Sequence, residues 1–135
     1  MIHVLGIDHL VLRVQDAPRM TRFYCEVLGC KVERARQDIG LIQLRAGQSL
    51  IDLVPVDGEL GRRGGAAAGV EGRNMDHFCL SVEPFDPLAV IAHLIRHGVV
   101  PGETKQRYGA DGVGPSIYIT DPEGNTVELK GPRGS

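Results

Sequence analysis

An eight-residue segment that occurs twice is the feature that most limits how this 135-residue chain can fold. Residues 7–14 read I-D-H-L-V-L-R-V and residues 75–82 read M-D-H-F-C-L-S-V. The second copy lies 68 positions after the first, and four of the eight positions are identical. The density of apolar and branched residues predicts that each copy is a mostly buried strand. The repeat therefore indicates two similar units that share one architecture.

Each copy is followed by the signals that begin and end a helix. An acidic residue with an early proline opens each one, as Asp16-Ala17-Pro18 in the first half and Asp86-Pro87 in the second. Apolar residues at helical spacing follow, and Gly29 and Gly98 supply the stops. We therefore expect one amphipathic helix after each copy of the repeat.

Alternating patterns predict three more strands in each half. They cover residues 31–36, 39–44 and 50–54 in the first half, and residues 104–108, 116–120 and 126–130 in the second. Residues 121–125, D-P-E-G-N, read as a hairpin turn. The fold class predicted is α+β, with two tandem βαβββ modules (residues 1–56 and 75–131) that form paired antiparallel sheets around a shared space. The glycine-rich residues 57–74 between them are either a flexible linker or a mobile loop over a site.

The amino-acid composition limits the classes of molecule that the chain is expected to bind. Fifteen basic and 17 acidic residues give a formal charge of −2, which provides no global field for nucleic acid or an anionic membrane. No apolar run is long enough for a bilayer-spanning helix, and the first residues do not read as a signal peptide. Three cysteines without a Cys-x-x-Cys motif suit free thiols and a cytoplasmic location. Aromatic residues make up 4%, so recognition must depend on charges, backbone or a metal.

Four polar residues stand inside apolar strands and require an explanation. His9 and His77 occupy the same place in the two copies of the repeat, whereas Asp52 and Glu128 lie on the last predicted strand of each half. A single such residue is usually a satisfied core or rim residue. Two imidazoles and two carboxylates at repeat-equivalent positions instead predict a divalent-metal site, which suits Zn, Ni, Co, Mn or Fe.

Three longer motifs resemble those of the vicinal oxygen chelate superfamily, which includes glyoxalase I, extradiol dioxygenases and bleomycin-resistance proteins. Residues 8–14 with residues 23–29 are similar to the opening of that family's first module. Residues 76–82 resemble the opening of the second module, and residues 121–129 resemble its terminal hairpin with a metal-binding glutamate. The resemblance covers residues 5–131.

The resemblance implies paired βαβββ modules around a shared metal cleft, with His9, Asp52, His77 and Glu128 as ligands. Asp52 stands where glyoxalase I has a glutamate. A glyoxalase-like lyase or isomerase would act by metal-stabilised enediolate chemistry on a small oxygenated substrate, with Glu128 or Asp52 as the base. Two alternatives are an extradiol-type Fe(II) dioxygenase and a non-catalytic binding protein of the bleomycin-resistance type.

Predictions about the substrate and about assembly depend on fewer residues. Arg13 resembles an arginine that contacts the carboxylate of glutathione in glyoxalase I, although it also reads as an ordinary strand-end charge. Arg107 reads either as part of a clamp for an anionic substrate or as a solvated loop residue. Tyr118 lines the pocket if it faces the same side of its strand as its polar neighbours. The resemblance also implies a homodimer, which is physically reasonable for exposed sheet edges.

Overall fold

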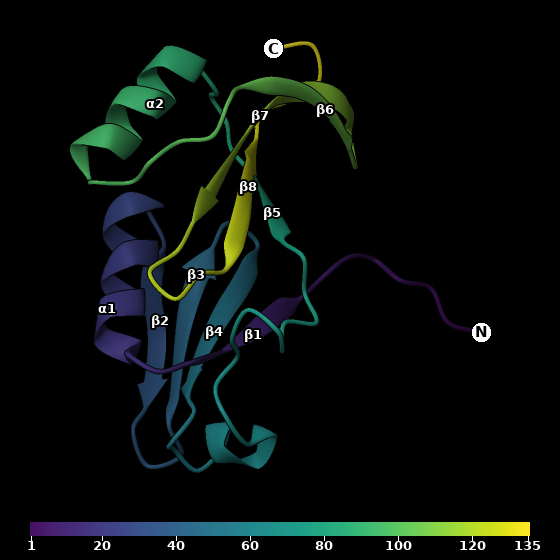
Figure 1. Cartoon of the computed structure of the whole chain (residues 1–135). Helices are drawn as coiled ribbons and strands as arrows, with labels where there is room; N and C mark the ends of the chain where they lie inside the picture. Colours follow the sequence, from purple (N-terminus) through teal and green to yellow (C-terminus); the bar gives the residue numbers. More distant parts are fainter. The chain divides into compact units, whose positions relative to one another are not determined.

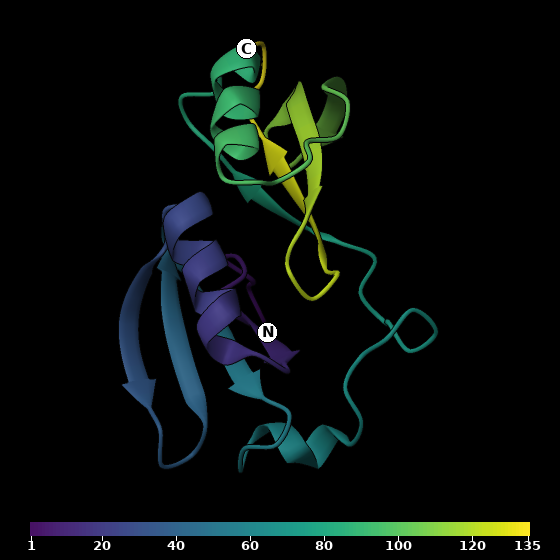
Figure 2. The same ribbon diagram turned by 60° about the vertical axis from the view of Figure 1, so that its left-hand side comes forward.

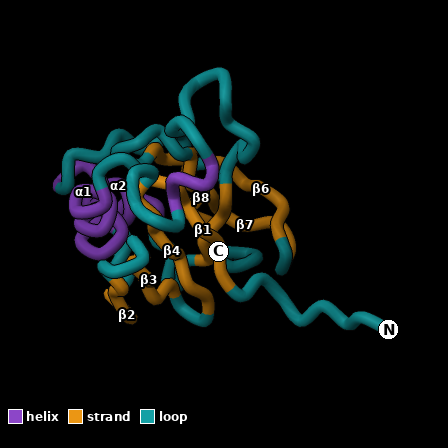
Figure 3. The backbone as a smooth tube through the Cα atoms, turned by 90° about the horizontal axis from the view of Figure 1, so that it is seen from below, coloured by secondary structure: helices purple, strands orange, loops and turns teal.

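The computed structural model describes residues 1–135 as two compact units, residues 1–72 and residues 73–135 (Figure 1). Each unit contains one four-stranded sheet with helical segments inserted after its first strand. The predicted α+β class with two βαβββ modules is therefore confirmed. Residues 1–8 form neither a helix nor a strand (Figure 3). None of the helices has the length and apolar character of a membrane-spanning segment.

The first unit has the strand order β1-β4-β3-β2. Its elements are β1 (His9–Val14), α1 (Ala17–Arg22), η1 (Phe23–Val27), β2 (Lys31–Arg36), β3 (Leu41–Ala46), β4 (Ser49–Pro55) and η2 (Gly61–Gly64). The predicted helix forms as α1 followed directly by the π-helical turn η1. Asp16 caps it by accepting a 3.0 Å hydrogen bond from the backbone N–H of Arg19. Gly29 follows its end with φ +76°, a conformation that favours glycine.

The second unit repeats this order as β5-β8-β7-β6. Its elements are β5 (Phe78–Ser81), α2 (Pro87–Arg96), β6 (Lys105–Gly109), β7 (Gly112–Thr120) and β8 (Thr126–Lys130). Asp86 caps α2 through the backbone N–H of Leu88, and Gly98 ends it with φ +74°. The first strand, predicted over residues 75–82, is shorter than expected, so His77 lies directly before β5 rather than inside it.

Both sheets are mixed, which corrects the antiparallel sheets that the sequence predicted. β2, β3 and β4 form an antiparallel meander, but β1 pairs with β4 in parallel; β5 likewise pairs with β8 in parallel. The direction follows from the chain path. The helix returns the chain after the first strand, so the second and fourth strands of each unit run in the same direction as the first.

One face of each sheet is apolar and belongs to the core of its unit. In Figure 2 the helix α1 lies along the sheet of the first unit. Its Met20 is buried with Leu44, Ile51 and Leu53, while Ile117, Ile119, Val127 and Leu129 are buried in the second unit. Side chains alternate between the two faces of a strand. β1 is therefore only half buried, with Leu12 and Val14 in the core and Val11 50% exposed, and the expectation of a mostly buried strand is wrong.

The opposite face of each sheet carries polar side chains, and we call it the polar face. It includes Gln43, Arg45 and Asp52 in the first unit, and Arg107, Ser116, Tyr118, Glu128 and Lys130 in the second. Four of these residues are themselves buried, namely Asp52, Ser116, Glu128 and Lys130. Buried polar groups are costly unless they are partnered, so this face is where a functional site is expected.

The glycine-rich segment after β4 has defined contacts in its first part. Arg13 of β1 donates hydrogen bonds from its guanidinium to the backbone carbonyls of Gly61, Gly65 and Ala66. Gly61 also lies against the end of β4, because a Cβ atom added to it would stand 1.8 Å from the carbonyl oxygen of Pro55. Residues 61–66 are therefore packed against the first sheet and do not form an unconstrained linker.

Substituting Gly61 with alanine is expected to destabilise the first unit by roughly 1–3 kcal/mol, the usual cost of overpacking. The added methyl group would displace the backbone of Pro55 and disturb the contacts made by Arg13. Gly69→Ala is the matched control, since a Cβ at Gly69 meets no atom within 4 Å. Urea denaturation of both variants measures the difference, and equal stabilities would show that residues 61–66 are not packed as described.

Candidate functional site

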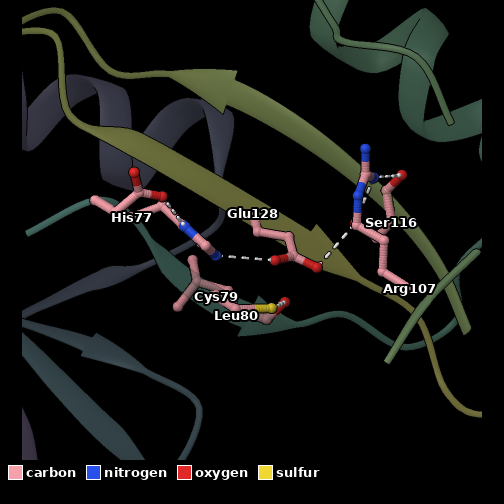
Figure 4. A network of polar contacts seen from close by, with 7 residues as sticks. His77, Cys79, Leu80, Arg107, Ser116 and Glu128 are labelled. Carbon is pink, nitrogen blue, oxygen red and sulfur yellow. Dashed lines mark hydrogen bonds and ion pairs between the residues drawn. The ribbon is translucent and has the colours of Figure 1, made fainter. Parts of the chain in front are cut away.

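The second unit brings His77 and Glu128 together on its polar face. Glu128 lies in the middle of β8, opposite Cys79 of β5, and is buried. Nε2 of His77 lies 3.2 Å from Oε1 of Glu128 (Figure 4). An imidazole and a carboxylate at this distance form an ion pair when the histidine is protonated, and both groups are common ligands of divalent metals.

The second oxygen of Glu128 is held by a chain of hydrogen bonds. The hydroxyl of Ser116 donates to Oε2 of Glu128 at 2.8 Å, and Ser116 is completely buried. Nη1 of Arg107 donates to the hydroxyl oxygen of Ser116 at 2.8 Å and to its carbonyl oxygen at 2.9 Å. Figure 4 shows Glu128 between His77 and Ser116. The carboxylate is therefore fixed on one side and presents its other oxygen towards His77.

Tyr118 lies beside this pair, on the same face of β7 as Ser116. Its ring meets the His77 ring edge-on, with centroids 5.1 Å apart, and the guanidinium carbon of Arg107 lies 4.5 Å from its centroid. Burial and, next, the charge of Glu128 raise the pKa of Tyr118. The phenol is thus neutral at physiological pH and can donate a hydrogen bond.

Cys79 also lies next to Glu128, but its thiol is a poor nucleophile and a poor metal ligand. Burial, followed by the nearby charge of Glu128, raises the pKa of the Cys79 thiol to about 11. The thiol is therefore protonated at neutral pH, whereas a nucleophile or a metal ligand must be a thiolate. This agrees with the expectation that the cysteines are free structural thiols.

An aspartate precedes each of the two repeated histidines and contacts it directly. Nδ1 of His9 lies 2.7 Å from a carboxylate oxygen of Asp8, and Nδ1 of His77 lies 2.7 Å from Asp76. When the Nδ1–H donates to the carboxylate, Nε2 keeps its lone pair for a ligand. The hydrogen bond that the His9 ring donates to Asp8 raises the pKa of His9, desolvation opposes this rise, and the charge of Asp52 adds to it.

The first unit places Asp52 on the same face of its sheet as His9. His9 pairs with Leu50 and Val11 pairs with Asp52, so alternation puts both side chains on the polar face. Asp52 is 4% exposed; its Oδ2 accepts a 3.2 Å hydrogen bond from Gln43, and its buried Oδ1 has no hydrogen-bond partner. A buried carboxylate oxygen without a partner is costly and fits a bound cation.

The predicted residues fall into separate groups. His77, Glu128, Arg107 and Tyr118 lie together in the second unit, and His9 and Asp52 share a face in the first. Arg13 belongs to neither group, because its guanidinium binds backbone carbonyls of the glycine-rich segment. No three His, Cys, Asp or Glu side chains come together as a metal-binding group, so each unit by itself supplies one imidazole and one carboxylate.

Comparisons with known proteins agree with this architecture. The profile of the Glyoxalase/Bleomycin resistance protein/Dioxygenase superfamily matches residues 6–129. The chain is 33% identical over 130 residues to Virulence protein STM3117 of Salmonella typhimurium, covering 91% of this chain and 81% of that protein. The chain therefore belongs to the Glyoxalase/Bleomycin resistance protein/Dioxygenase superfamily.

Solved structures show the same fold over nearly the whole chain. An integron cassette protein from the mobile metagenome of V. cholerae superimposes with a TM-score of 0.78 at 30% identity, covering 97% of this chain and 98% of that one. Lactoylglutathione lyase from Agrobacterium tumefaciens superimposes with a TM-score of 0.66 at 18% identity, covering 95% and 94%. At that identity the second comparison shows the fold alone. The superfamily includes many enzymes and also non-enzymatic members.

Proposed function

We propose that the chain is a divalent-metal-dependent lyase or isomerase that acts on a small oxygenated substrate. The ligands would be the imidazole and carboxylate of each unit, His9 with Asp52 and His77 with Glu128. A bound divalent ion would supply Lewis-acid stabilisation of the negative charge that develops on neighbouring oxygens of the substrate. Superfamily membership and the likeness in fold to a lactoylglutathione lyase support this class of chemistry.

The observation that carries the proposal is the buried, unpartnered Oδ1 of Asp52. A carboxylate that serves only the fold would have both oxygens paired or exposed, whereas Oδ1 of Asp52 is buried and has no hydrogen-bond partner. The equivalent carboxylate, Glu128, has its free side towards an imidazole. Each unit thus supplies a carboxylate and an imidazole, which is the donor set that Zn, Ni, Co, Mn and Fe accept.

Glu128 is the residue that we assign as the base. It lies on the same face as Arg107 and Tyr118, the two predicted substrate-binding side chains of its unit. Ser116 holds Oε2, so Oε1 is the oxygen that can take a proton from the carbon next to a substrate carbonyl. Tyr118, with its raised pKa, can donate a hydrogen bond to a substrate oxygen.

The test is metal reconstitution followed by proton exchange. Metal-free protein is loaded separately with Ni, Co, Zn, Mn or anaerobic Fe(II), and elemental analysis counts the ions retained per chain. We expect one ion per chain and metal-dependent exchange of the proton next to a carbonyl, detected by NMR in D₂O over a panel of small hydroxy- and oxo-compounds. Gel filtration of the same samples checks the predicted homodimer.

Two results would overturn the proposal in favour of a different function. Uptake of O₂ with catechols by the Fe(II) form, without proton exchange in any form, would identify a dioxygenase. Absence of bound metal after reconstitution would identify a non-catalytic binding protein. Glu71→Gln protein serves as the control for preparation and loading, since Glu71 is exposed and is not one of the proposed ligands.

A further inference from the structure

Arg107 of β6 is held in place before any ligand binds. Its guanidinium lies over the ring of Tyr118, with the central carbon 4.5 Å from the ring centroid. Nη1 is used twice, once for the hydroxyl and once for the carbonyl oxygen of Ser116. Stacking on an aromatic ring and two hydrogen bonds fix a planar cation in one orientation.

The charge of Arg107 has no direct counter-charge. Arg36 pairs with Asp38 at 2.7 Å, Arg45 pairs with Glu33 at 2.8 Å, and the buried Lys130 pairs with Asp111 at 3.0 Å. Arg107 forms no ion pair with a carboxylate, and its Nε and Nη2 donate no hydrogen bond in the structure. A partly buried guanidinium therefore keeps one edge of donors unused on the polar face of the second unit.

The unused donors of Arg107 belong to a side chain that lies near the proposed base, Glu128. A single hydroxyl group, that of Ser116, lies between Nη1 of Arg107 and Oε2 of Glu128. Figure 4 shows Arg107 next to Ser116, on the opposite side of Glu128 from His77. An anion bound by Arg107 would thus lie close to the atoms on which Glu128 acts, and a compact molecule would reach both.

We infer that the substrate carries an anionic group, a carboxylate or a phosphate, that is bound by the free edge of Arg107. This inference rests on the proposed function for the identity of the substrate, but the anion site itself does not require the metal. Both kinds of anion accept paired hydrogen bonds from one edge of a guanidinium, which gives charge recognition and orientation together. Arg107 then acts as a specificity-determining residue.

Two matched pairs of small molecules test the inference in metal-free protein. Pyruvate is compared with methyl pyruvate, and dihydroxyacetone phosphate with dihydroxyacetone, so that each pair differs by the anionic group. Protein NMR measures the dissociation constants for the wild type, Arg107→Gln, Arg107→Lys and Arg36→Gln. Circular dichroism confirms that each variant is folded.

We expect the anionic member of at least one pair to bind about tenfold more tightly to the wild type. Arg107→Gln should remove that preference, Arg107→Lys should keep part of it, and Arg36→Gln should keep all of it. The pair with the larger preference identifies the anion as a carboxylate or a phosphate. Equal affinities within both pairs, or an unchanged preference in Arg107→Gln, would overturn the inference. Since no metal is present, failure of the reconstitution experiment leaves this result unaffected.

Discussion

Replacing Glu128 with glutamine is expected to reduce metal-dependent proton exchange by about 10²–10⁴-fold, the contribution typical of a general base. The change removes the charge and keeps the shape. The amide oxygen of glutamine can still accept the hydrogen bond from Ser116, so the local fold should persist. The same change removes one anionic ligand, and titration of Ni(II) into metal-free protein should show at least about a tenfold weaker dissociation constant.

The control for this substitution is Glu71→Gln, which removes the same charge from an exposed residue. Exchange rates and Ni(II) affinities of the control should equal those of the wild type. If Glu128→Gln kept more than a tenth of the wild-type exchange rate, Glu128 would not be the base. Asp52 would then be the remaining carboxylate among the predicted ligands.

The sequence predicted the elements of the fold well wherever local chemistry decides the structure. Both helices begin after the expected aspartate caps, and both are followed by glycines with positive φ. Each helix end depends on residues only a few positions away, so local residue type and spacing were sufficient to predict it. The repeat of the D-H-x-x-L-x-V pattern was enough to predict two similar modules, because each copy must begin an equivalent sheet.

Long-range strand pairing explains where the predicted boundaries failed. Residues 75 and 76 cannot extend β5, because its register would place them opposite residues 124 and 125, which precede β8. β7 is longer than predicted and includes Gly112–Pro115, which read as a loop. A Cβ at Gly114 would stand 2.6 Å from the carbonyl oxygen of Pro132, so this glycine allows close backbone approach within a strand.

The candidate site was only partly predictable, because the contacts of its residues also depend on long-range strand pairing. The pattern of polar residues inside apolar strands predicted both histidines and both carboxylates. It missed Ser116 and Gln43, which the structure places against Glu128 and Asp52. Gln43 lies between Ile42 and Leu44, and Ser116 precedes Ile117, so the same signal was present. Their partners depend on cross-strand register, which the sequence did not provide.

Asp52→Asn is expected to change stability and metal binding in opposite directions. In metal-free protein the substitution removes a buried charge whose Oδ1 has no partner, while the amide oxygen keeps the hydrogen bond from Gln43. The free energy of unfolding should therefore rise by about 1 kcal/mol, because a neutral amide costs less to bury than a charged carboxylate. Ni(II) affinity should fall at least about tenfold, as expected for loss of a charged ligand.

Thermal denaturation with and without Ni(II) separates the two effects, because a ligand that binds the folded state raises the melting temperature according to its affinity. Ni(II) should raise the melting temperature of the wild type more than that of Asp52→Asn, although the variant should be at least as stable without metal. Asp38→Asn is the control, since Asp38 is exposed and pairs with Arg36. Asp52 would instead be a structural residue if Asp52→Asn were less stable than the wild type without metal and if Ni(II) raised both melting temperatures equally. A stable fold with a weakened response to the metal is the behaviour of a residue retained for binding.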